Sequence, residues 1–188
     1  MRARRQHGFT LTELMIAVAI VAVLASLAVT LLRTNPQPVD VAAQISSKLA
    51  ETSRKAVTYA AVRSDVAAAL GSKARTRAEL VASSNGVTMT LYVLQEDAAP
   101  AVSASWLELS SVKLDSHIVL AGYTTSAVLT SGGAPAITVG SAGTFDVMCV
   151  PDGTCEGMTI YLTDMKGVRK ARVVVLPLGG APMTFDTW

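Results

Sequence analysis

The 188-residue sequence predicts an α+β protein in which a long N-terminal helix precedes a head built on antiparallel β-strands. Three observations support this class: an uninterrupted apolar segment near the N-terminus, helical spacing of apolar residues after it, and alternation with a period of two beyond Ala74. Helices followed by a run of strands are typical of α+β domains.

The first element is the apolar segment at residues 9–32, which reads FTLTELMIAVAIVAVLASLAVTLL. It has 24 residues without Gly or Pro, and as a helix it would extend about 36 Å. A bilayer core is about 30 Å thick, so the segment is long enough to span a membrane. Basic residues ahead of it favour a cytoplasmic N-terminus and a single-pass topology; they are Arg2, Arg4 and Arg5.

Glu13 is the only ionisable residue in this segment. A carboxylate at the centre of a membrane helix costs about 2.5–3.5 kcal/mol, and less near the interface. Acids at such positions are typically paired, and the segment contains no cation. We therefore expect the counter-ion of Glu13 to belong to another molecule.

Two simpler interpretations of the N-terminus leave residues unexplained. A cleaved secretory signal would use the arginines as its basic region and Ser26-Leu27-Ala28 as its cleavage site. A plain membrane anchor needs only the apolar segment. Neither interpretation gives Glu13 a role, and the anchor also leaves Gly8 without one.

A third interpretation comes from residues 4–29, RRQHGFTLTELMIAVAIVAVLASLAV, which resemble the N-terminus of type IV prepilins and type II secretion pseudopilins. The resemblance implies that a prepilin peptidase cuts after Gly8 and that the new N-terminal residue, Phe9, is N-methylated. Glu13 corresponds to the glutamate that stands fifth in the mature chain of that family. Because the methylated amine stays cationic, Glu13 of one subunit would pair with Phe9 of a neighbour and fix the axial register.

The predicted boundaries follow from these patterns. The cleaved leader comprises residues 1–8, and the transmembrane or filament-core helix comprises residues 9–33. Pro36 and Pro38 then break the helix, because proline disfavours helix at the residue before it. Residues 34–72 hold an amphipathic helix that ends at Gly71. Its apolar positions are Val41, Ile45, Leu49, Ala56, Tyr59, Ala60, Val66 and Leu70.

The β-rich globular head occupies residues 73–188. Asn85-Gly86 is a strong hairpin signal between its first two strands. One face of the second strand is apolar, with Val87, Met89, Leu91 and Val93, and we expect it to be buried. Strands are expected at 78–83, 87–94, 106–113, 118–123, 143–149, 158–163 and 169–176.

The two cysteines flank a turn sequence. Cys149 and Cys155 enclose Val-Pro-Asp-Gly-Thr, and we expect a disulfide that contributes about 2.4 kcal/mol in the chain-entropy model. Free thiols are the alternative. A calcium site at Asp152 is disfavoured because no carboxylate cluster with ligand spacing surrounds it. No metal and no cofactor are therefore expected.

The sequence also argues against an enzyme. His117 is the only histidine left after the leader, and the sequence contains neither a histidine-paired nucleophile motif nor a phosphate-binding loop. Removal of the leader leaves 13 Lys and Arg against 14 Asp and Glu, a formal charge of −1. That balance is not typical of a nucleic-acid-binding protein.

The second half of the sequence contains one basic cluster, and strand alternation places two of its residues, Lys170 and Arg172, on one face. We interpret it as a solvated hairpin; a patch that binds DNA or a partner is the alternative, without the interleaved aromatic residues that would favour nucleic acid. The cluster comprises Lys166, Arg169, Lys170 and Arg172.

Parts of the head resemble the GspH/FimT group of minor subunits. The resemblance is carried by Thr144-Phe145-Asp146, Gly153, the stretch MTIYLTD at 158–164, Gly167, Val173-Val174-Val175 and Gly179-Gly180. DNA-binding FimT members have an arginine-rich motif after the terminal glycine, whereas Gly179-Gly180 is followed here by Ala-Pro. A FimT-like role in DNA uptake is thereby disfavoured.

These resemblances imply a minor type IV pilin, a non-enzymatic subunit of the priming or tip complex that initiates pilus assembly. Its partners would be other minor pilins, the major pilin and the prepilin peptidase, with no small-molecule substrate. It would sit in the bacterial inner membrane with its head in the periplasm, and later at the pilus tip on the cell surface. A GspH-like minor pseudopilin of the type II secretion system is the alternative.

Overall fold

The computed structural model describes residues 11–31, 36–83, 86–97, 103–130, 133–139 and 143–188. For residues 27–31 it describes the backbone alone. It is an α+β protein with antiparallel sheets, as the sequence predicts. The chain divides into two compact units, residues 1–35 and 36–188.

The first unit contains helix α1, Leu11–Leu31. Glu13 lies in its first turn, and the described side chains from Leu11 to Ser26 are exposed. The predicted apolar segment, residues 9–32, begins and ends outside the described residues. Among the residues that are described, no helix is long and apolar enough to cross a membrane.

The second unit begins with helix α2, Pro38–Thr58. Residues 36 and 37 are not helical, which agrees with the predicted proline break, and Pro38 occupies the first turn, where its missing N–H costs nothing. The carboxylate of Asp40 accepts a hydrogen bond of 2.9 Å from the backbone N–H of Gln37. Four of the predicted apolar positions are buried in α2, namely Val41, Ile45, Leu49 and Ala56, together with Ala42 and Thr52. Of the other predicted positions, Val66 is buried, Tyr59 is half-buried, and Ala60 and Leu70 are exposed.

The prediction of one amphipathic helix as far as Leu70 is wrong. Helix α2 ends at Thr58, and a separate short helix, α3, spans Ser64–Leu70. Arg63, just before α3, and Arg75, after it, both bond to β2: the Glu96 carboxylate accepts hydrogen bonds from the Arg63 N–H at 3.3 Å and from Arg75 Nη1 at 2.6 Å. Tertiary contacts here override the local helical pattern. Gly71 ends α3 with φ at 65°, as predicted.

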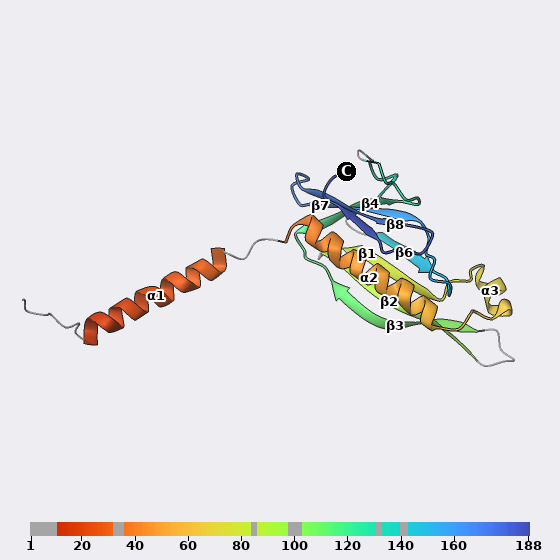
Figure 1. Cartoon of the computed structure of the whole chain (residues 1–188), viewed down its shortest axis with the longest axis horizontal. Coiled ribbons are helices and arrows are strands. Elements are labelled where there is room, and N and C mark those ends of the chain that lie inside the picture. Colours follow the sequence, from red (N-terminus) through yellow and green to blue (C-terminus); the bar gives the residue numbers. More distant parts are fainter. Residues whose placement is uncertain (1–10, 32–35, 84–85, 98–102, 131–132, 140–142) are drawn as a thin grey trace, which may run out of the picture. The chain divides into compact units, whose positions relative to one another are not determined.

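Two antiparallel sheets form the rest of the head (Figure 1). Sheet A has the order β3-β2-β1-β6, and sheet B has the order β5-β4-β7-β8-β9. The strands of sheet A are β1 (Thr76–Ser83), β2 (Gly86–Glu96), β3 (Ala104–Lys113) and β6 (Gly143–Cys149). Those of sheet B are β4 (Ile118–Thr124), β5 (Ile137–Thr138), β7 (Met158–Asp164), β8 (Lys170–Val175) and β9 (Met183–Phe185).

All seven predicted strands are present with ends within two residues of those expected. Ser83 pairs with Gly86, so β1 and β2 form the expected hairpin, although Asn85 lies outside the described residues. The sequence did not predict β5 and β9. Both are short and lie at the two edges of sheet B, where a brief apolar run gives no period-2 signal.

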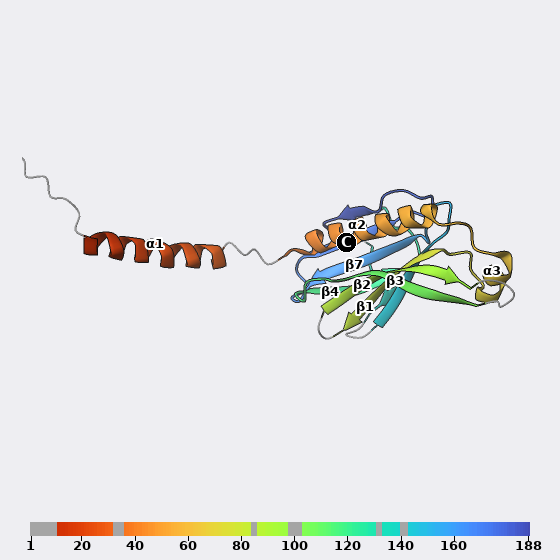
Figure 2. The same cartoon turned by 90° about the horizontal axis from the view of Figure 1, so that it is seen from below.

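Helix α2 packs against strands of both sheets, as the two views in Figures 1 and 2 show. The apolar face of β2 is buried as predicted. One continuous core results, which α2 shares with both sheets; its largest fully buried side chains are Ile45, Leu49, Leu80, Met89, Leu91, Ile118, Leu120, Ile160 and Leu162.

The interpretation of Arg172 as part of a solvated hairpin is wrong, because its side chain is only 1% exposed. Its Nη1 donates a 2.6 Å hydrogen bond to the carbonyl of Thr130, and its guanidinium lies 4.6 Å from the ring centroid of Phe185. The chain between β4 and β5 is tied to this face of sheet B, since Thr159 Oγ1 donates to the Ser126 carbonyl at 2.8 Å. This covering segment excludes water from Arg172.

Candidate functional site

The predicted processing site, Gly8 and Phe9, lies outside the described residues. Glu13 follows Phe9 by four residues and is exposed in the first turn of α1. A carboxylate in the first turn interacts favourably with the helix dipole. The described part of α1 therefore presents this acid beside the N-terminal end of an otherwise apolar helix.

Cys149 and Cys155 form a disulfide in the structure, with Cα atoms 4.0 Å apart. The enclosed turn is closed by two backbone bonds of 2.9 Å, from Val150 N to Thr154 O and from Gly153 N to Val150 O. Gly153 has φ at 85°, a conformation that favours glycine. The Pro-Asp-Gly sequence therefore brings the two sulfur atoms together by turn formation.

Asp152 stabilises this turn with its side chain. Its Oδ1 accepts hydrogen bonds from the backbone N–H of Thr154 at 2.8 Å and from the Thr154 hydroxyl at 2.6 Å. The Thr154 hydroxyl, more than its N–H, holds the pKa of Asp152 below the usual value. Within the described ranges no group of three or more His, Cys, Asp or Glu residues is placed to hold a metal ion.

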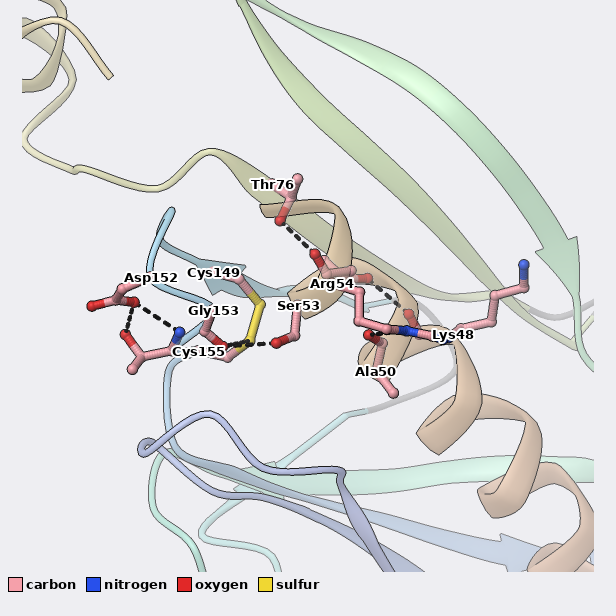
Figure 3. Close-up of a disulfide and its surroundings, with 11 residues drawn as sticks. Lys48, Ala50, Ser53, Arg54, Thr76, Cys149, Asp152, Gly153 and Cys155 are labelled. Atoms are coloured by element: carbon pink, nitrogen blue, oxygen red, sulfur yellow. Dashed lines mark hydrogen bonds between the residues drawn. A yellow bond between two sulfur atoms is a disulfide. The ribbon is translucent and has the colours of Figure 1, made fainter. Parts of the chain in front are cut away.

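The disulfide turn also contacts α2 (Figure 3). Ser53 Oγ donates a 2.7 Å hydrogen bond to the Gly153 carbonyl, and a Cβ on Gly153 would lie 2.8 Å from Val57 Cγ2. Nearby, Thr76 Oγ1 on β1 donates to the Thr52 carbonyl at 3.0 Å. The C-terminal half of α2 is thus fastened both to the turn and to sheet A.

The four residues of the predicted basic cluster do not form one surface. Lys166 and Arg169 are exposed in the turn between β7 and β8, whereas Arg172 is buried. Lys170 is half-buried, with its Nζ 4.0 Å from the ring centroid of Trp188. His117 lies next to this turn, since its carbonyl accepts a 3.2 Å hydrogen bond from the Met165 N–H, and its Nδ1 lies 2.8 Å from Asp115 Oδ1.

Sequence reasoning missed two residues that organise these surfaces. Ser53 anchors the disulfide turn, but a serine on a polar helix face carries no distinguishing signal. Trp188 lies under Lys170 and donates its Nε1–H to the Leu162 carbonyl at 3.2 Å. A tryptophan beyond the last predicted strand was the available signal, because a buried indole N–H usually finds an acceptor.

Replacing both cysteines by serine is expected to lower the free energy of unfolding by about 2.4 kcal/mol, since the unfolded chain regains the entropy of the closed loop. Urea unfolding of the full-length protein measures the change. A reductant should destabilise the unmodified protein by a similar amount and leave the double variant unchanged. Equal stability with and without reductant would contradict the expectation.

Comparison with known proteins supports the assignment of the N-terminus. Residues 3–29 match a family model described as the prokaryotic N-terminal methylation motif. Curated proteins gave no match. Among solved structures, the chain is similar to the minor pseudopilin EpsH from the type 2 secretion system of Vibrio cholerae, with 11% identity and a TM-score of 0.46 over 80% of this chain and 98% of that one. The resemblance is thus confirmed for the N-terminal segment, and residues 3–29 are a prepilin-type N-terminal methylation motif.

Proposed function

We propose that this protein is a minor type IV pilin, a non-enzymatic subunit of the priming or tip complex that starts pilus assembly. One observation supports the proposal: residues 3–29 match a methylation motif, and within them Gly8, Phe9 and Glu13 correspond by resemblance to the cleavage site, the methylated residue and the fifth-position glutamate of type IV prepilins. The α+β head on an amphipathic helix agrees with a structural subunit.

The proposed route begins in the bacterial inner membrane. The apolar segment at residues 9–32 inserts with the arginines of the leader on the cytoplasmic side, which places the head in the periplasm. Prepilin peptidase then cuts after Gly8, and methylation of the Phe9 amine keeps its positive charge. An oxidising periplasm would preserve the disulfide between Cys149 and Cys155.

Assembly would then be driven by burial of the apolar helix among its neighbours and directed by one ion pair. Glu13 of this subunit meets the Phe9 ammonium of an adjacent pilin subunit, where the low dielectric strengthens their attraction. Because each charge is costly to bury without its partner, the pair favours the one axial register in which the two charges meet over registers in which they do not. The partners are therefore other minor pilins and the major pilin.

A deletion strain tests this assignment. Loss of surface pili and twitching motility supports a minor pilin. Loss of exoprotein release with normal pili would instead identify a GspH-like minor pseudopilin of the type II secretion system, since the two classes share the same N-terminal motif. Loss of DNA uptake with normal pili would identify a FimT-like subunit. Complementation with the intact gene controls for effects on neighbouring genes.

Substitutions of Gly8 test the processing step. A bulky residue, as in Gly8→Leu, is expected to block cleavage because a large side chain obstructs the peptidase at the scissile bond. Gly8→Ala adds one methyl group and should be processed better. Immunoblots of membrane fractions measure the ratio of precursor to mature chain, and N-terminal sequencing identifies the new first residue. Normal processing of Gly8→Leu would contradict the proposed cleavage site.

A further inference from the structure

The turn between β7 and β8 exposes apolar and basic side chains together. The Asp164 carboxylate accepts a 2.9 Å hydrogen bond from the Val168 N–H, and the Gly167 N–H donates to the Asp164 carbonyl at 3.0 Å. The turn is therefore well ordered by its own hydrogen bonds. Met165 is 70% exposed and Val168 is 76% exposed, beside exposed Lys166 and Arg169.

A groove of about 370 Å³ lies beside this turn. Trp188 forms part of its wall, with the ammonium of Lys170 over its ring and its Nε1–H bonded to the Leu162 carbonyl. An indole with an adjacent cation is typical of the interface between lipid headgroups and hydrocarbon. The groove is lined by Gln37, Pro38, Val39, Val168, Arg169, Lys170, Asp186, Thr187 and Trp188.

The position of the groove in the chain favours a lipid as its partner. Gln37 and Pro38 line it, and they follow the last residue of the apolar segment, Leu32, by only five and six residues. If that segment spans the membrane, as the proposed function holds, the start of α2 is tethered close to the outer surface of the inner membrane. The groove and the turn beside it would share that location.

The charges of this surface suit anionic headgroups. Lys166, Arg169 and Lys170 supply three cations, and basic side chains are attracted to an anionic membrane surface. Acids oppose them, and one of these is Asp115, which contacts His117 next to Met165. The carboxylate of Asp164 is engaged in the turn, whereas Asp186 is exposed at the groove. The exposed tip formed by Met165 to Arg169 is thus basic and apolar.

We propose that the turn at residues 165–169, together with Lys170 and Trp188, rests on the anionic phospholipids of the inner membrane before the subunit enters a filament. Met165 and Val168 enter the headgroup layer, and the three cations bind phosphate groups. This contact holds the periplasmic head against the membrane. The inference rests on the proposed function, because the membrane segment provides the tether.

Fluorescence quenching of Trp188 tests the contact. The chain has two tryptophans, so Trp106→Phe leaves Trp188 as the reporter, and Trp188→Phe leaves Trp106 on β3 of the other sheet as the matched control. Each full-length protein is reconstituted into vesicles that contain phosphatidylglycerol and a lipid spin-labelled near its headgroup. The Trp188 signal should fall at least two-fold more than the Trp106 signal, and 0.5 M salt should reduce the difference.

Charge-reversal variants then test whether the basic residues of the turn make the lipid contact. Lys166→Glu/Arg169→Glu should abolish at least half of the Trp188 quenching, whereas reversal of two exposed lysines elsewhere, Lys73→Glu/Lys113→Glu, should leave it unchanged. Equal quenching of both tryptophans, or undiminished quenching in phosphatidylcholine vesicles, would overturn the inference. If the surface binds an acidic protein and not lipid, Trp188 will show no quenching in the vesicles, and this result would also overturn the inference.

Flotation of the same vesicles separates this inference from the proposed function. Protein that floats with the vesicles but shows no Trp188 quenching overturns the lipid contact and leaves membrane insertion intact. Protein that fails to float overturns the proposed membrane insertion, and the lipid contact with it.

Discussion

Glu13→Gln is expected to leave the protein in the membrane but to reduce its recovery with partner pilin subunits at least ten-fold. Glutamine keeps the shape of the side chain and removes its charge, so the Phe9 ammonium of the neighbouring subunit would be buried without a counter-ion. Removal of one member of a buried pair costs about 3–5 kcal/mol, and about 1.4 kcal/mol corresponds to a factor of ten in affinity. Co-purification of tagged subunits from solubilised membranes measures the loss.

Two variants control this experiment. Glu13→Asp retains the charge on a shorter side chain and should assemble better than Glu13→Gln. Glu51→Gln makes the same chemical change on α2, where Glu51 pairs with Lys48 and Lys55 at a partly exposed site, and should leave assembly unchanged. If Glu13→Gln co-purified as well as the unmodified protein, the ion pair would not set the register.

Ile160→Ala is expected to lower the free energy of unfolding of the head by about 3 kcal/mol. Ile160 is fully buried on β7, a central strand of sheet B, and it pairs in register with Tyr123 on β4 and Val173 on β8. Truncation of a buried isoleucine removes apolar contacts and leaves a cavity, which together cost about 2–5 kcal/mol. Urea unfolding followed by circular dichroism measures the change.

Ile137 provides the matched control, because it is the same residue type on an edge strand of the same sheet and is 42% exposed. Ile137→Ala should cost less than about 1 kcal/mol, since most of the lost contacts are with solvent. Similar losses for the two variants would show that sheet B is not packed as described.

Much of the head was predictable because alternation in the sequence matches burial in the sheets. The apolar face of β2, with Val87, Met89 and Leu91, is a pattern that only a half-buried strand satisfies. The end of α2 was not predictable in this way. The apolar spacing continues past Thr58, but the helix ends there, and the chain that follows is bonded at Arg63 to Glu96, more than thirty residues later.

The candidate sites also include some residues that the sequence reveals and others whose environment depends on the tertiary fold. The segment at residues 3–29, which contains Gly8, Phe9 and Glu13, is recognisable from sequence because a methylation motif is a short linear pattern that does not depend on the fold of the head. The burial of Arg172 is a tertiary effect. Strand alternation correctly places it on the face of Lys170, but the segment that carries Thr130 and covers that face has no sequence feature that announces its position.

The bond between Cys149 and Cys155 limits how far the chain extends when it is pulled from its two ends. Fully stretched, the six steps along the backbone between these residues would span about 20 Å, but the disulfide keeps their Cα atoms 4.0 Å apart. An oxidised chain under load therefore has a contour length about 16 Å shorter than a reduced one. Single-molecule stretching would record this hidden length as a difference between the two redox states.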